Sequence, residues 1–152
     1  MSRLGPEAMK LLATVAIVAF FVAASALRYR PPSPKPADAP LTEFSAGRAR
    51  EVLRGLVGDG QPHPTGSLAA GRVRQRIVAQ LEQLGYAPEI QEKFACGVVR
   101  LCARVTNVLA RLDGTGRGKA VLLSVHYDSV PAGPGASDDG IGVAAALEVA
   151  RA

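Results

Sequence analysis

Aromatic residues and histidine are scarce in this sequence. The 152 residues include no tryptophan, 5% aromatic residues and two histidines. The arginines fall on helix-like segments without the interleaved aromatic side chains that would stack on bases. Because the net charge of +5 is also modest, we interpret the arginines as solvated helix faces. The composition therefore argues against a nucleic-acid partner.

Cysteine is equally rare. The two cysteines, Cys96 and Cys102, match no zinc-finger spacing, and the sequence has no others to complete one. They are close enough in sequence to form a disulfide across a small loop, and such a bond persists only in an oxidising compartment. Two buried thiols are the alternative.

The longest uncharged stretch lies near the N-terminus. Leu11 to Leu27, LLATVAIVAFFVAASAL, follows Lys10 and precedes Arg28. As a helix it would span roughly 25 Å, slightly less than the hydrocarbon core of a bilayer. The basic start, the apolar centre and the small residues Ala24 to Ala26 equally fit a secretory signal peptide. Both interpretations, a transmembrane anchor and a signal-peptide core, bring the chain to a membrane.

The side of the membrane is indicated by two conflicting signals. Slightly more positive charges follow the apolar run than precede it, which favours a cytoplasmic C-terminal side. Arg3 and Lys10 precede the run, and Arg28, Arg30 and Lys35 follow it. The A-S-A site and the cysteines favour export instead. We expect the domain on the non-cytosolic side, in the periplasm or in an organelle lumen.

The sequence divides into four segments. Residues 1–10 form a basic N-terminal segment, residues 11–27 the apolar helix, residues 28–41 a linker, and residues 42–152 a folded domain. Five prolines between Pro31 and Pro40, PPSPKPADAP, hold the linker extended. We predict a semi-rigid spacer that lifts the domain off the membrane surface.

The folded domain has the pattern of an α/β fold. Helices are predicted at 45–57, at 68–84 and after Gly140, and strands at 87–94, 104–112 and 119–126. The turn DGTG at 113–116 predicts a hairpin between the second and third strands. The third strand, KAVLLSVH, is continuously apolar at its centre, as expected of a strand covered on both faces. We predict a mixed central sheet flanked by helices, incomplete in this chain.

Polar residues gather where the third predicted strand ends. His126 and Asp128 would share one face of the strand, while Tyr127 points to the other. A neutral imidazole is a good zinc ligand, and a neighbouring carboxylate can accept its other N–H. After a Pro/Gly loop, Asp138 arrives at the start of a helix, where its carboxylate could bridge two metal ions. A His–Asp pair or an Asp-Asp-Gly step alone is also typical of ordinary hydrogen bonding or a helix cap, but together they predict a metal site.

The stretch HYDSVPAGPGASDDGIGVAAALEVAR resembles the co-catalytic zinc aminopeptidase family, metallopeptidase family twenty-eight, around its first metal-binding region. The segments PHPTGS and TNVLARL and the short loop between the histidine and the aspartate are most similar to the membrane-bound Fxna or endoplasmic-reticulum metallopeptidase branch. The resemblance implies a zinc exopeptidase-like three-layer sandwich, two zinc ions in the complete site and a peptide substrate.

The resemblance also implies roles for individual residues. His126 matches a zinc ligand and Asp138 the metal-bridging aspartate. Asp128 matches the catalytic acid, which acts by supporting the histidine. Asp139 follows the bridging aspartate at a position where family members can carry a cis peptide bond.

The rest of the family's site has no counterpart in this sequence. That site requires a Glu-Glu pair, another aspartate and a final histidine, but the sequence has no Glu-Glu pair and no histidine after His126. We interpret His63 as a loop residue and Glu148 as a structural one. The helical pattern also runs to Ala152 without a stop signal. We therefore expect the N-terminal part of a longer zinc exopeptidase, inactive by itself.

Two other functions remain open. The pattern H-x-D-x-V-P also occurs in a related amidohydrolase and carboxypeptidase family, although that family has a longer gap before its bridging aspartate and a Lys-Gly step after it. The other candidate is a membrane-tethered, peptidase-like binding domain without activity. The presence of His126, Asp128 and Asp138 together favours the peptidase.

Overall fold

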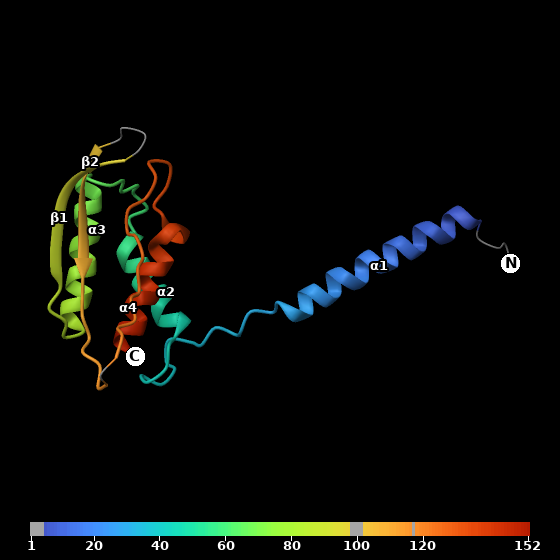
Figure 1. Cartoon of the computed structure of the whole chain (residues 1–152), viewed down its shortest axis with the longest axis horizontal. Helices are drawn as coiled ribbons and strands as arrows, with labels where there is room; N and C mark the ends of the chain where they lie inside the picture. Colours follow the sequence, from blue (N-terminus) through green and yellow to red (C-terminus); the bar gives the residue numbers. More distant parts are fainter. Residues whose placement is uncertain (1–4, 98–101, 117) are drawn as a thin grey trace. The chain divides into compact units, whose positions relative to one another are not determined.

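The computed structural model describes residues 5–97, 102–116 and 118–152. They form two units, divided between Ser33 and Pro34. The first unit holds helix α1 (Pro6–Arg28). The elements of the second are α2 (Ala46–Val57), α3 (Leu68–Gln83), β1 (Glu89–Cys96), β2 (Cys102–Leu109), a single turn η1 (Ala136–Gly140) and α4 (Ile141–Arg151) (Figure 1).

Helix α1 is the one helix of the described ranges that is long and apolar enough to cross a membrane. Its 23 residues would span about 35 Å. Charges are confined to its ends, where Lys10 pairs with Glu7 at 2.9 Å and Arg28 lies in the last turn. Arg3 of the predicted basic segment lies outside the described residues. An anchor and a signal sequence share these properties, so the apolar helix is confirmed and both interpretations retain support.

Three helices of the second unit build the apolar core. Its fully buried members come from α2, α3 and α4; they are Leu56, Val73, Ile77, Leu81, Val143 and Leu147. The α3 members recur every four residues and therefore lie on one face of that helix. Helix α3 begins where Ser67 accepts a hydrogen bond from Ala70 N at 3.0 Å, and Gly85, with φ of +87°, follows its end. The predicted helices are thus confirmed.

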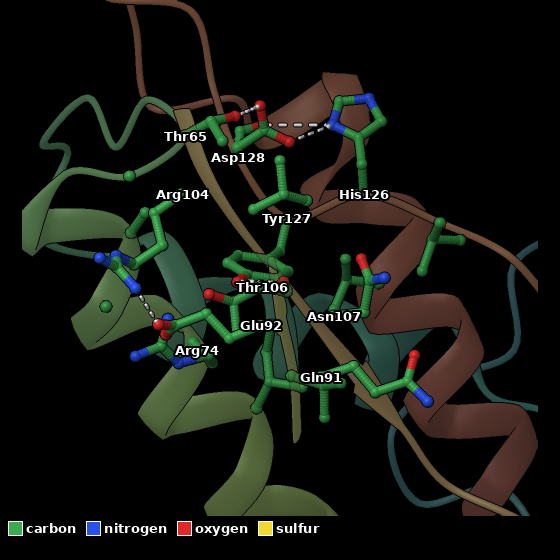
Figure 2. A pocket seen from close by; sticks show the side chains of 18 of the residues that line it. Thr65, Arg74, Gln91, Glu92, Arg104, Thr106, Asn107, His126, Tyr127 and Asp128 are labelled. Carbon is green, nitrogen blue, oxygen red and sulfur yellow. Dashed lines mark hydrogen bonds and ion pairs between the residues drawn. The ribbon is translucent and has the colours of Figure 1, made fainter. Parts of the chain in front are cut away.

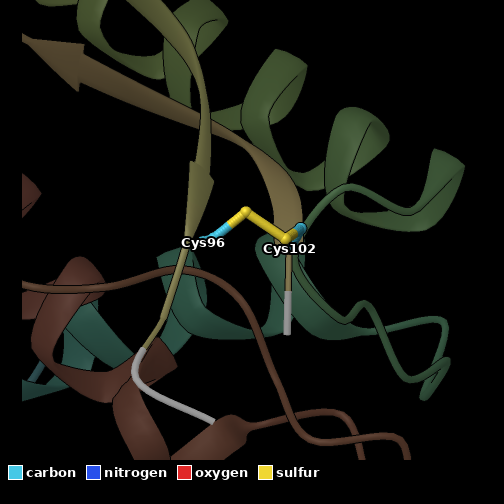
Figure 3. Close-up of a disulfide and its surroundings, with 2 residues drawn as sticks. All are labelled: Cys96 and Cys102. Carbon is cyan, nitrogen blue, oxygen red and sulfur yellow. A yellow bond between two sulfur atoms is a disulfide. The ribbon is translucent and has the colours of Figure 1, made fainter. Parts of the chain in front are cut away.

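The sheet consists of an antiparallel pair, β1 and β2, which lies beside α3 (Figure 1). Cys96 and Cys102 face each other in the register and form a disulfide at the end of the pair (Figure 3). Strand β1 is exposed along its whole length, whereas Val108 of β2 packs against the core. The domain is therefore a partial α/β fold, in agreement with the predicted fold class.

Two strand predictions were wrong. Residues 119–126 lie outside any strand, and the hairpin joins the first and second predicted strands instead of the second and third. Val121 and Leu122 are 89% and 85% exposed. An apolar run indicates that a segment tends to be buried, but a strand also needs a partner backbone for its N–H and C=O groups. Within the described ranges, residues 119–126 have no such partner.

Glu148 of α4 is a buried acid, with 2% of its surface exposed. Its carboxylate accepts hydrogen bonds from Ser45 N and Arg48 Nε at 2.9 Å and from Arg151 Nε at 2.8 Å. The two arginines also donate to backbone carbonyls within residues 37–43. The end of the predicted linker is therefore bonded to the folded unit, which begins at Pro34.

These bonds change the acidity of Glu148. The hydrogen bond from Arg151 lowers its pKa, burial opposes this, and the bonds from Ser45 and Arg48 lower it further, to about 2 from the usual 4.5. Because the folded pKa lies below the unfolded one, the stabilisation is fully present above pH 4.5 and is lost as the pH falls toward 2. The difference corresponds to roughly 3 kcal/mol at neutral pH.

We predict that Glu148→Gln lowers the free energy of unfolding by roughly 3 kcal/mol at pH 7 and by clearly less at pH 3, because the wild type loses the same stabilisation in acid. Urea unfolding followed by circular dichroism at both pH values measures this. Glu43→Gln is the matched control, since it breaks an exposed ion pair with Lys35 and should cost less than about 1 kcal/mol. Equal losses for the two variants at pH 7 would contradict the prediction.

Candidate metal centre

The segment from His126 to Gly140 brings three predicted site residues together. His126 Nε2 lies 3.0 Å from Asp138 Oδ1. On the other side of the ring, His126 Nδ1 lies 3.3 Å from Asp128 Oδ1 and 3.2 Å from the Asp128 carbonyl oxygen. Each ring nitrogen therefore faces an oxygen of one of the two aspartates.

This arrangement limits how the neutral ring can bond. A neutral imidazole donates from one nitrogen and accepts at the other. If Nδ1 donates to Asp128, Nε2 directs its lone pair toward the carboxylate of Asp138. Two electron-rich groups that face each other in this way can be satisfied by a cation between them, or by a proton on the ring.

The electrostatics of the ring agree with this interpretation. Partial burial lowers the pKa of His126, but the hydrogen bonds with the Asp138 side chain and the Asp128 carbonyl outweigh it, and the charges of both aspartates act in the same direction. The pKa of His126 is therefore raised above its usual value. The surroundings of the imidazole favour positive charge.

The loop before Asp138 depends on a glycine. Gly135 has φ of +63°, in the left-handed region that favours glycine. A Cβ at this position would lie 2.8 Å from the Cβ of Ser129 and 2.9 Å from the Asp138 carbonyl oxygen. Gly140 N donates to Gly135 O at 2.9 Å and closes the turn. A side chain at residue 135 would thus push apart the two chain segments that place Asp138 opposite His126.

The adjacent acids Asp138 and Asp139 have different surroundings. The peptide bond between them is cis. Asp139 Oδ1 accepts a hydrogen bond from Gly142 N at 3.1 Å and so caps the start of α4. The side chain of Asp138 is 86% exposed, and its partner is His126. Asp139 is therefore tied to the helix, whereas Asp138 is available to a ligand.

The side chains at this site are of the types that bind zinc, but they are too few to form a complete zinc site. Imidazole nitrogen and carboxylate oxygen are typical zinc ligands, but a catalytic zinc normally has three protein ligands. Residues 5–97, 102–116 and 118–152 contain no group of three or more histidine, cysteine, aspartate or glutamate side chains placed to hold a metal. His126 and Asp138 thus correspond to part of a metal site.

His63 and Glu148 bond to groups other than the three residues of the candidate site. His63 is 2% exposed, and its backbone N–H donates to Ser129 Oγ at 2.8 Å. Glu148 belongs to the arginine cluster at the other end of α4. Both have structural surroundings, as the sequence indicated.

Thr65 contacts the site but was missed in the sequence. Its Oγ1 donates a hydrogen bond to Asp128 Oδ2 (Figure 2). The two residues are 63 positions apart, so no local periodicity connects them. The sequence signal was the PHPTGS segment itself. It contributed to the family resemblance, but the resemblance assigned no role to Thr65.

A groove of about 940 Å³ adjoins these residues. It is lined by α3, β2 and the segment from Leu122 to Asp128. His126, Asp128 and Thr65 lie at one end of it, while Arg74, Arg104 and Glu92 lie farther along (Figure 2). The candidate metal ligand is therefore next to a space that could admit another chain segment or a ligand.

Comparisons with known proteins find similar sequences among peptidases. Residues 107–152 match the profile of peptidase family M28. A vacuolar membrane protease of Coprinopsis cinerea is 29% identical over 158 residues, which cover 91% of this chain and 15% of that protein. The vacuolar membrane protease of Candida albicans is 39% identical over 94 residues, covering 59% of this chain and 11% of that protein. The corresponding protein of Candida dubliniensis is 50% identical over 46 residues, covering 30% of this chain and 5% of that protein.

The arrangement of His126 and Asp138 lies within the residues that match this family. Residues 107–152 of this chain are therefore similar to peptidase family M28. The chain spans no more than 15% of the length of the three relatives described above.

The two acids at the start of α4 should respond differently to substitution. We predict that Asp139→Ala lowers the free energy of unfolding by about 1 kcal/mol, because it removes a helix cap, and that Asp138→Ala changes it by less than about 0.5 kcal/mol, because the side chain is exposed. Urea unfolding in the presence of a chelator measures both. Asp139→Ser keeps an oxygen acceptor and should restore most of the loss. Equal effects of Asp138→Ala and Asp139→Ala would show that the cap is not specific to Asp139.

Proposed function

We propose that this protein is a membrane-associated zinc exopeptidase of the aminopeptidase type, in which His126 and Asp138 bind zinc and Asp128 supports His126. The observation that carries the proposal is the 3.0 Å approach of His126 Nε2 to Asp138 Oδ1, with Asp128 at the other ring nitrogen. The match of residues 107–152 to peptidase family M28 supports a peptide substrate.

Each of the three residues has a defined task in this proposal. Asp128 accepts the Nδ1 hydrogen of His126 and thereby leaves Nε2 free to bind a metal. Asp138 has two carboxylate oxygens, so one residue can contact two ions. Zinc at this position would supply Lewis acidity, which polarises a peptide carbonyl and lowers the pKa of water.

Residues 1–152 lack part of the family's catalytic site. The sequence has no Glu-Glu pair, which the family uses for its general base and a further ligand. We therefore assign no proton-transfer residue here and expect residues 1–152 alone to be inactive. The complete protein is the right material for activity measurements.

The zinc site is tested by His126→Ala and Asp138→Ala in the complete protein. We expect each substitution to reduce the zinc content and to lower the turnover of an aminoacyl coumarinyl amide by about 100-fold or more, because ligand and bridging functions are lost. Elemental analysis and fluorescence measure the two effects. Asp113→Asn, an acid in an exposed turn, should change neither. Wild-type zinc content and turnover in His126→Ala would end the proposal.

The same assay separates an exopeptidase from other functions. An aminopeptidase needs a free substrate amine, so the N-acetylated form of the substrate should not be cleaved. Cleavage of blocked substrates would contradict the aminopeptidase type while leaving the zinc site intact. Zinc binding by the complete protein without turnover of any peptide would favour the inactive binding domain.

The proposal places the peptidase domain on the non-cytosolic side of the membrane. The support comes from the Cys96–Cys102 disulfide, because such bonds persist in oxidising compartments. The membrane association itself is supported by α1 and by the names of the similar proteins, which are vacuolar membrane proteases.

The oxidation state of Cys96 and Cys102 tests the proposed compartment. Trypsin cuts after Lys93, Arg100 and Arg104, so each cysteine falls in its own short peptide. If thiols are blocked before lysis and the protein is digested without reductant, we expect FACGVVR and LCAR to be found linked to each other by mass spectrometry. Reduction should release them as separate peptides. Recovery of both peptides fully alkylated before reduction would place the domain in a reducing compartment.

A further inference from the structure

The loop of residues 63–67, HPTGS, is fastened to the chain directly after Asp128. His63 N donates to Ser129 Oγ at 2.8 Å, and Ser129 N donates to His63 O at 3.2 Å. His63 and Ser129 are 2% and 7% exposed. Because both bonds are buried, they hold the loop beside the end of the apolar segment that carries His126.

The loop is also fixed at its other end. Ser67 Oγ accepts a hydrogen bond from Ala70 N at 3.0 Å and begins α3. Thr65 lies between these two anchors, and its hydroxyl contributes to neither. The hydroxyl donates instead to Asp128 Oδ2. The position of the loop is therefore secured without Thr65, which leaves its hydroxyl to act on Asp128.

Each carboxylate oxygen of Asp128 has a different neighbour, and the backbone carbonyl of Asp128 also lies 3.2 Å from His126 Nδ1. Thr65 Oγ1 bonds Oδ2, while Oδ1 lies 3.3 Å from His126 Nδ1. Figure 2 shows Thr65, Asp128 and His126 in this order at one end of the groove. The outer torsion of an aspartate is otherwise broadly distributed, so a bond to one oxygen restricts the direction of the other. A hydroxyl that donates to a charged carboxylate also forms a stronger bond than one between neutral groups.

We propose that Thr65 is a positioning residue of the metal site: it orients the Asp128 carboxylate, and through it the tautomer and direction of the His126 ring. This inference rests on the proposed zinc site at His126 and Asp138. It extends that site to a loop 63 positions earlier in the chain.

The test measures zinc affinity in the complete, metal-stripped protein by competition with a chromophoric chelator. Thr65→Val keeps the shape of the side chain but cannot donate a hydrogen bond, and we expect it to weaken zinc binding about three- to tenfold, somewhat less than loss of a direct partner of a ligand. Thr65→Ser restores the donor and should restore the affinity. Thr115→Val, in the turn at 113–116, is the matched control and should bind as the wild type does.

A double-mutant cycle shows whether Thr65 acts through Asp128. In an Asp128→Ala background, Thr65→Val should weaken zinc binding no further. A further loss would mean that Thr65 acts by another route and would overturn the inference. Thr65→Ala serves as a second donor-free variant if urea unfolding shows that valine disturbs the loop.

The outcomes separate this inference from the proposed function. If Thr65→Val and Thr65→Ala bind zinc as tightly as the wild type while His126→Ala does not, the zinc site stands and the role of Thr65 is overturned. If His126→Ala itself binds zinc as the wild type does, the proposed site is wrong, and the inference fails with it.

Discussion

The bonds of the buried Glu148 carboxylate are the interaction on which the rest of the folded unit depends. They pair with Arg48 and Arg151 and satisfy the amide of Ser45, which precedes α2. Because Glu148 lies on α4, the same bonds fix α4 against α2. The opposite end of α4 is capped by Asp139 and carries Asp138. A charged cluster at one end of the helix therefore helps to position the candidate metal ligand at the other.

The cluster also explains why a proline-rich segment can be part of a folded unit. Proline has no backbone N–H, so such a segment offers carbonyl acceptors with few donors of its own. A guanidinium has five N–H donors, and those of Arg48 and Arg151 bind carbonyls within residues 37–43. Glu148 makes this arrangement favourable by pairing with both guanidinium groups and offsetting part of their positive charge, since an unpaired buried charge is strongly destabilising. The stiffness predicted for the linker is thus supplemented, over its second half, by bonds to the domain.

The features that could be predicted from the sequence are those that local chemistry determines. The four-residue spacing of Val73, Ile77 and Leu81, together with the cap at Ser67, was enough to define α3. His126 and Asp128 lie together because they are two residues apart, although the strand expected to align them is not formed. Strand pairing is not local, and the apolar run at 119–126 could not reveal which backbone, if any, lies beside it. The contact between Thr65 and Asp128 was equally inaccessible, because it exists only after the HPTGS loop has docked on Ser129.

The candidate site is formed although the sheet is small, because local contacts rather than strand pairing determine its geometry. The facing of His126 and Asp138 is set by a short segment: Gly135 allows the turn, the bond between Gly140 and Gly135 closes it, and α4 fixes its end. None of these contacts involves residues 119–125, whose apolar side chains are largely exposed. The geometry of this half of the site therefore does not require a covered sheet. The groove beside it does depend on that segment, since Leu122, Leu123 and Val125 line it. Any segment that pairs with residues 119–125 would consequently reshape this groove and leave the His126–Asp138 pair in place.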